Sequence, residues 1–195
     1  AGTAGYEDGG EAGPEELLRA AETAPAGARG VLFLPFLAGE RAPLWRSDLR
    51  GAFLGLSAEH GRADLARAVA ESLGLGLRLT SDGLKKLGYE TRLVRLSGAP
   101  ARNMFLSRLK ADILGLPVEI PEIPDCELVG NAAACALALK DEKSLAEAAV
   151  RLVRVALRFE PDAGRSALYE RLFAVFSDAV AAILPLSQRL SAPPE

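Results

Sequence analysis

The segment from residue 92 to residue 139 constrains the fold of this chain more than any other. It predicts, in order, a strand, a turn of small residues, a helix that stops at Gly115, a second strand and an alanine-rich helix, at 92–96, 97–102, 103–114, 117–120 and 128–139. Strands that alternate with helices in this way are typical of an α/β architecture. Ligands of such folds bind beside the carboxyl ends of the strands, which makes Ser97–Asn103 the first place to expect a site.

Apolar patterns on either side predict the rest of the fold. Strands are expected at 31–37 and 52–56, and long helices at 64–87 and 164–190, with further short helices at 14–24 and 144–151. Residues 153–159 stay ambiguous between a strand and an extended loop. We divide the chain into residues 1–30, a flexible lead-in with a short helix, and one domain over residues 31–195.

Composition and charge exclude several classes of protein. The 26 acidic and 23 basic residues give a formal charge of −3, which argues against the basic surface of a nucleic-acid-binding protein. No stretch of 18 apolar residues is present, and the glycine-rich start is unlike a secretory signal. We therefore expect a cytoplasmic protein that has neither nucleic acid nor a membrane as its partner.

Residue types that usually carry catalysis are scarce. Cys126 and Cys135 lack the CxxC spacing of a zinc site, and we expect two reduced and mostly buried thiols. His60 is the only histidine and lies in a polar turn, where a solvated loop residue is the favoured interpretation. We assign no catalytic residue and no metal ligand within this chain.

Two loops concentrate residues that could serve a ligand. In Ser97–Asn103, small residues after a strand let a ligand approach the backbone, and the helix that follows offers free N–H groups. The same pattern is common as pure packing, so both interpretations stay open. Loop Gly39–Trp45 combines Glu40, Arg41, a proline and the only tryptophan. It predicts either a surface Glu–Arg pair with the tryptophan covering the core edge, or a rigid loop that lines a polar cleft.

Six segments carry a further signal when they are taken together. They are LFLPFLAGERAP (32–43), RGAFLGL (50–56), LARAVAESLGLGLR (65–78, with the acid Glu71), LSGAPARN with LKADILGLPV (96–103 and 109–118), ELVGNAA (127–133), and RFEPD (158–162) with the tyrosine-bearing helix after it. In this order and without a large gap, they resemble the C-terminal part of the FGGY carbohydrate kinases.

This resemblance implies the C-terminal part of an actin-like, ribonuclease-H-like ATPase domain, incomplete without strands that precede it. It also implies ATP and Mg²⁺ as cofactors, and transfer of the γ-phosphate to a sugar or polyol hydroxyl. The N-terminal kinase domain, upstream or separate, becomes the expected partner, because it holds most of the sugar site and the aspartate base. Association with further copies of the chain stays open.

The resemblance also assigns roles to individual residues. Gly98 and Ala99 would border the adenosine, Asn103 would reach it through its side chain, and Gly130, opening the neighbouring helix, would shape the pocket. Glu40 and Arg41 would line the cleft between the domains, in an organising role.

The chain departs from the family pattern at the turn. Ala99 stands where a glycine is usual, and a left-handed backbone there would add strain of about 1 kcal/mol or more. Arg108 stands where a glutamine is frequent. The expected substrate is a pentulose such as xylulose, with hexulose, gluconate, glycerol or another polyol open, and the chain alone is expected to be inactive. Alternatives are a non-catalytic regulatory or assembly module that retains the kinase fold, and an unrelated α/β binding domain.

Overall fold

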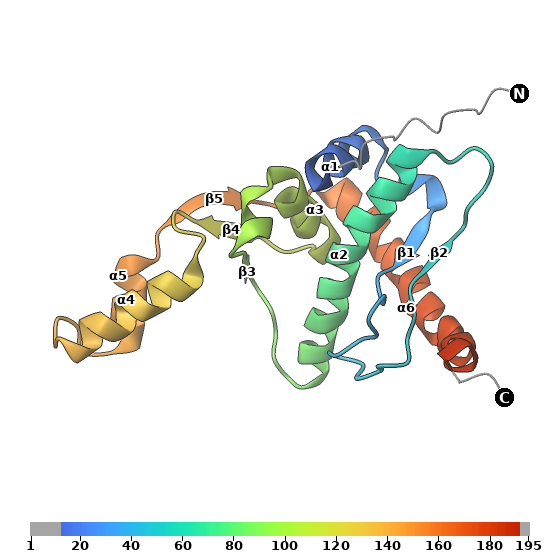
Figure 1. Cartoon of the computed structure of the whole chain (residues 1–195). Helices are drawn as coiled ribbons and strands as arrows, with labels where there is room; N and C mark the ends of the chain where they lie inside the picture. The colour runs from blue at the N-terminus through green and yellow to red at the C-terminus, as the bar shows by residue number, and fades with distance from the viewer. Residues whose placement is uncertain (1–12, 192–195) are drawn as a thin grey trace, which may run out of the picture.

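A computed structural model describes residues 13–191 (Figure 1). Its elements within that range are α1 (Pro14–Thr23), η1 (Ala28–Gly30), β1 (Leu32–Leu34), β2 (Ala52–Leu54), α2 (Arg62–Lys86), β3 (Val94–Arg95), η2 (Ala99–Arg102), α3 (Met104–Leu114), β4 (Val118–Pro121), α4 (Cys126–Ala138), α5 (Leu145–Leu152), β5 (Val155–Phe159) and α6 (Ala163–Ser191). The expected α/β architecture is confirmed. Residues 1–12 of the expected lead-in lie outside the described range.

β3, β4 and β5 form one sheet, and its first two strands are those expected in the segment from residue 92 to residue 139. β3 and β4 are parallel and β4 and β5 are antiparallel, in the order β3-β4-β5. The ambiguous residues 153–159 thus supply a strand, because β5 pairs with β4 from Val155 to Phe159. β3 lies at one edge, and no strand within residues 13–191 pairs with its outer side.

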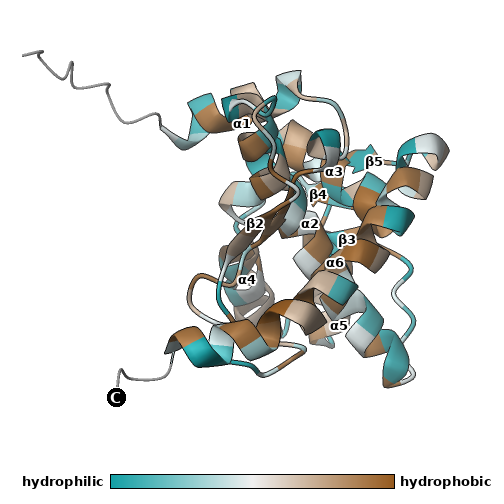
Figure 2. Ribbon diagram, turned by 90° about the vertical axis from the view of Figure 1, so that its right-hand side faces the viewer, coloured by the Kyte–Doolittle hydropathy of each residue, from teal (hydrophilic) through white to brown (hydrophobic). Residues whose placement is uncertain are grey.

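The other two strands form a separate antiparallel pair. Leu32 lies opposite Leu54, and Leu34 lies opposite Ala52. β1 is shorter than the apolar run 31–37 predicts, since Pro35 follows it and proline has no N–H to donate to a sheet. Both strands consist of apolar residues, LFL in β1 and AFL in β2, and β2 is coloured as hydrophobic in Figure 2.

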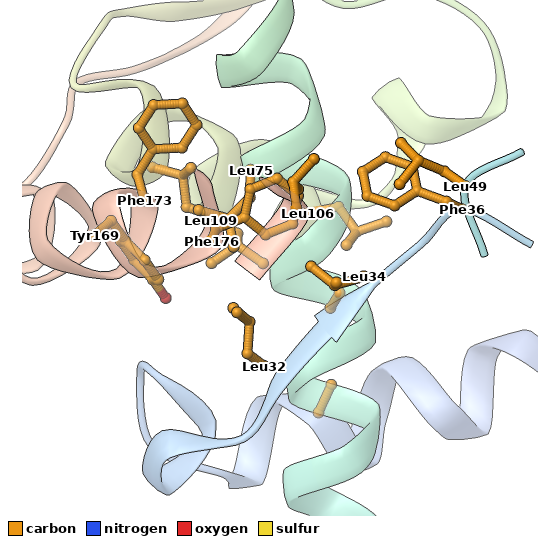
Figure 3. Close-up of a cluster of buried hydrophobic side chains, with 14 residues drawn as sticks. Leu32, Leu34, Phe36, Leu49, Leu75, Leu106, Leu109, Tyr169, Phe173 and Phe176 are labelled. Atoms are coloured by element: carbon orange, nitrogen blue, oxygen red, sulfur yellow. The ribbon is translucent and has the colours of Figure 1, made fainter. Parts of the chain in front are cut away.

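The main hydrophobic core lies between β1 and helices α2, α3 and α6 (Figure 3). Leu34, Leu75, Ile113, Tyr169 and Phe176 are almost fully buried in it. Ala21 of α1 belongs to the same cluster. The division of the chain at residue 30 is not tested by this packing and stays a prediction.

A buried polar cluster lies within this core. Oε1 of Glu71 accepts hydrogen bonds from Arg67 Nε at 2.7 Å, Tyr169 Oη at 2.7 Å and the backbone N–H of Gly27 at 2.8 Å. Arg67 Nη2 also donates to Tyr169 Oη at 2.9 Å, and its guanidinium lies over the Phe105 ring at 5.1 Å. Burial raises the pKa of the Tyr169 hydroxyl well above its usual value. One carboxylate thus ties α2 to α6 and to the turn before η1.

A second buried carboxylate fixes the start of α6. Asp112 of α3 accepts hydrogen bonds from Arg165 Nε at 2.6 Å and from the backbone N–H of Asp162 at 2.8 Å. Asp162 in turn accepts from the backbone N–H of Arg165 at 2.9 Å, as a helix cap does. The RFEPD segment and the following helix are therefore anchored on α3.

Helices α4 and α5 form a hairpin that projects from the rest of the molecule (Figure 1). The two helices pack on each other through small residues, and only Ala133, Ala136 and Ala148 are buried in them. Cys126 and Cys135 are exposed, so the expectation of mostly buried thiols was wrong. The reason is that α4 has little of the body to pack against.

Candidate functional site

The turn after β3 is held in a conformation that requires glycine. Gly98 has φ +70° and ψ −162°, a region that residues with a Cβ avoid. Its N–H donates to the carbonyl oxygen of Pro124 at 2.8 Å, which joins the turn to the segment before α4. The turn therefore has a fixed shape at the carboxyl end of the strand.

The condition for strain at Ala99, a left-handed backbone, is not met. Ala99 begins the short helix η2 and is not among the residues with positive φ, because Gly98 takes the left-handed position. Asn103 then caps α3, since its Oδ1 accepts a hydrogen bond from the N–H of Leu106 at 2.9 Å. The guanidinium of Arg108 lies over the Phe159 ring at 5.7 Å. The arginine that stands where a glutamine is frequent therefore has a packing role.

A cavity of about 380 Å³ lies between this turn and the α4–α5 hairpin. Most of its lining is apolar, and the full set is Arg95, Leu96, Ser97, Pro121, Ile123, Cys126, Val129, Gly130, Ala133, Ala149, Leu152, Val153 and Arg154. It thus brings Ser97 and Gly130 together, whereas Gly98, Ala99 and Asn103 are not among its lining residues.

Gly130 does not open its helix. α4 begins at Cys126, two residues before the expected start, so Gly130 lies in the second turn. A Cβ placed on Gly130 would have no heavy atom within 4 Å. The absence of a side chain there leaves open space on the cavity side of α4.

Sequence reasoning missed the wall formed by Ala149, Leu152, Val153 and Arg154. The only available signal was the ambiguous stretch 153–159. If residues 153–159 form a strand antiparallel to β4, that strand begins where β4 ends. Its first residues then lie at the end of the sheet where Ser97 follows β3.

The sheet next to the cavity carries a row of charges. Glu119 of β4 accepts hydrogen bonds from Arg95 Nη2 at 2.7 Å and from Arg158 Nη1 at 3.0 Å. The hydrogen bond from Arg95, supported by Arg158, holds the pKa of Glu119 below its usual value. Arg95 is therefore already paired, although it lines the cavity.

Glu40 organises its own loop. Its Oε2 accepts hydrogen bonds from the backbone N–H groups of Leu44 at 2.8 Å and Trp45 at 3.1 Å, and its backbone pairs with that of Arg46. No ion pair joins Glu40 to Arg41 among the contacts of the described residues. The alternative of a surface Glu–Arg pair is therefore wrong.

A second cavity, of about 780 Å³, lies beside this loop. Pro43, Trp45, Leu84, Phe173 and Leu184 are among its mostly apolar lining residues, while Glu40 and Arg41 are not. Trp45 is 77% exposed, so it does not cover the core edge as one alternative expected.

No cluster of three or more His, Cys, Asp or Glu side chains that could hold a metal ion occurs within residues 13–191. Over the same residues, no helix is both long enough and apolar enough to span a bilayer. His60 lies in its turn with Nδ1 accepting a hydrogen bond from the N–H of Ser57 at 2.9 Å.

Comparison with known proteins gives consistent matches. Residues 4–139 match the model of the C-terminal domain of the FGGY family of carbohydrate kinases. A xylulose kinase of Staphylococcus epidermidis is 32% identical over 162 residues, which are 83% of this chain and 33% of that protein. Among solved structures, a ligand-bound xylulose kinase from Lactobacillus acidophilus has a TM-score of 0.85 at 28% identity, and a gluconate kinase from the same organism has 0.84 at 28%. Each structural match covers 92% of this chain and 36% of the other, so the chain spans about a third of the length of these relatives.

Proposed function

This chain belongs to the FGGY family of carbohydrate kinases, and we propose that it is the nucleotide-binding portion of an enzyme that transfers the γ-phosphate of ATP to a hydroxyl of a sugar or polyol. Its fold is the C-terminal part of the actin-like ATPase fold of the kinases it matches. The observation that carries the proposal is the cavity at the carboxyl ends of β3 and β4. ATP as the donor places the proposed activity in the cytoplasm.

The lining of the cavity supports an adenosine group as its ligand. Its walls are mainly apolar, as expected for a site that holds a flat aromatic base, and Gly130 leaves open space where a side chain would intrude. In this proposal Gly98 and Ala99 border the nucleotide through the backbone. Because Oδ1 of Asn103 already caps α3, only the Asn103 amide N–H groups are left to donate to the nucleotide.

Phosphoryl transfer would need groups from outside this chain. The proposed reaction is an in-line attack of a sugar hydroxyl on the γ-phosphorus, with positioning and charge stabilisation as the main catalytic factors. The described residues contain no cluster that fits Mg²⁺, so we assign the metal no ligand here. We propose that the remaining two thirds of the kinase supply the base, the sugar site and a strand beside the free edge of β3, and that the chain alone is inactive.

The loop of Glu40 and Arg41 is proposed to face the cleft between the two domains. The hydrogen bonds from Leu44 and Trp45 to Glu40 support an organising role for its carboxylate. The exposed side chain of Arg41 is free to contact the other domain.

A pentulose such as xylulose is the proposed substrate. The support is the match to a xylulose kinase in both sequence and structure, although a gluconate kinase matches the fold equally well. Neither Ala99 nor Arg108 favours the alternative of a non-catalytic module, since the first is unstrained and the second packs on Phe159.

We expect the full-length protein to release ADP from ATP in the presence of xylulose, and to do so more slowly with gluconate or glycerol. The measurement is ADP release by a coupled assay with each compound at equal concentration. ADP release that no sugar or polyol stimulates, together with no detectable nucleotide binding, would contradict the kinase assignment.

The two cysteines offer a direct test of the nucleotide site. Both thiols are exposed on α4, but only Cys126 lines the cavity. Mg-ADP at ten times its dissociation constant should therefore slow alkylation of Cys126 about tenfold, by mass action, and leave Cys135 unchanged. Tandem mass spectrometry of the alkylated full-length protein separates the two sites. Equal rates with and without ADP at Cys126 would place the nucleotide elsewhere.

A further inference from the structure

The start of β5 lies at the same end of the sheet as the last residues of β3. β3 and β4 are parallel, so Ser97 after β3 and Pro121 at the end of β4 lie at the same end of the sheet. β5 is antiparallel to β4, and Val155 pairs with Pro121. The residue before it, Arg154, is therefore brought to the cavity by the topology of the sheet.

The backbone of Arg154 is fixed in this place. Its carbonyl oxygen accepts a hydrogen bond from the N–H of Glu122 at 2.9 Å, which extends the pairing of β4 and β5 by one step. The backbone of Arg154 is thus fixed at the end of the sheet, and this exposed residue is among those that line the cavity.

The two arginines of the cavity differ in what they bind. Arg95 is paired with Glu119 at 2.7 Å, whereas the guanidinium of Arg154 has no hydrogen-bond or ion-pair partner within residues 13–191. A guanidinium is flat, remains charged at all accessible pH values and stacks on aromatic rings. Within residues 13–191, Arg154 is thus the cavity's planar cation without a partner.

The surroundings of Arg154 favour a base over a phosphate. Leu96, Ile123, Val129, Leu152 and Val153 form the apolar lining. A phosphate group would lose its hydration among these side chains, whereas the face of a purine ring would gain from the same contact.

We propose that Arg154 is a nucleotide-contacting residue whose guanidinium stacks on the purine base of ATP, opposite the apolar wall of the cavity. This inference rests on the proposed function. The segment between α5 and β5 thereby becomes part of the proposed nucleotide site. The purine base would be bound there by stacking on the guanidinium of Arg154.

The test uses three variants of the full-length protein and Mg-ADP as the probe. Arg154→Ala removes the guanidinium. Arg154→Lys retains the positive charge but replaces the planar guanidinium with an ammonium group that cannot stack. Arg151→Ala is the matched control, because Arg151 lies on the same hairpin, is exposed, and is paired with Glu142 outside the cavity lining. All three affinities are measured by titration calorimetry, and thermal unfolding checks that the fold is retained.

We expect Arg154→Ala and Arg154→Lys each to weaken Mg-ADP binding about tenfold, and Arg151→Ala to change it less than twofold. Wild-type affinity of Arg154→Lys would overturn stacking in favour of a charge contact. Unchanged affinity of Arg154→Ala, or equal losses in Arg151→Ala, would overturn the contact itself. If Cys126 is still protected by ADP in any of these cases, the proposed nucleotide site stands while the role of Arg154 falls.

Discussion

Replacement of Glu71 by leucine should destabilise the folded protein by about 3–5 kcal/mol, which is the largest effect we expect from a single substitution. Glu71 is 3% exposed and its Oε1 accepts three hydrogen bonds. Its loss would leave the Arg67 guanidinium buried without a countercharge, together with an unpaired backbone N–H at Gly27. Urea unfolding of the full-length protein, followed by circular dichroism, measures the change.

Two further variants distinguish the buried charge from general damage. The double substitution Arg67→Met with Glu71→Leu removes both charges, and should recover a large part of the lost stability. Glu16→Ala breaks the exposed ion pair with Arg62 and should cost at most about 1 kcal/mol. A loss for Glu71→Leu that is no larger than the loss for Glu16→Ala would show that the buried cluster does not stabilise the fold.

Replacement of Gly130 by leucine should weaken Mg-ADP binding by at least about 100-fold, that is, by about 2.7 kcal/mol. A side chain at position 130 would enter the open space on the cavity side of α4 and occupy the volume proposed for the adenosine. The fold should not suffer, because leucine is a better helix former than glycine by up to about 1 kcal/mol. Calorimetric titration and thermal unfolding of the same sample measure both effects.

Ala132→Leu is the matched control for this variant. Ala132 lies on the same exposed helix, two residues further on, and does not line the cavity. It should bind Mg-ADP as the unchanged protein does. Comparable losses in both variants would indicate a general disturbance of α4, and unchanged binding in Gly130→Leu would place the nucleotide outside this cavity.

The sequence predicted the helices well because their signals are local. The apolar residues of α2 and α6 repeat at helical spacing, and Asn103 and Ser144 stand where the structure has helix caps. β5 could not be predicted in the same way. Four of its five residues are exposed, so its apolar pattern is weak, and it becomes a strand only by pairing with β4.

The candidate site was predicted in part for a similar reason. Ser97 and Gly130 belong to segments with a recognisable small-residue pattern, and the structure places both on one cavity. Leu152 and Arg154 carry no such pattern, because an antiparallel pairing distant in sequence brings them there. The exposure of Cys126 and Cys135 was missed because the alanine-rich pattern of α4 is equally compatible with a buried helix.

The α4–α5 hairpin is inserted in the chain between β4 and β5, and its two helices share a small alanine contact of their own. One side of the cavity is therefore carried by an appendage, while the buried carboxylates that hold the body together lie elsewhere. In the proposed nucleotide site, substitutions along this appendage are expected to change the nucleotide preference at little cost to folding. Under the same proposal, the hairpin is the module to exchange between relatives when the phosphate donor, and not the acceptor sugar, is to be redesigned.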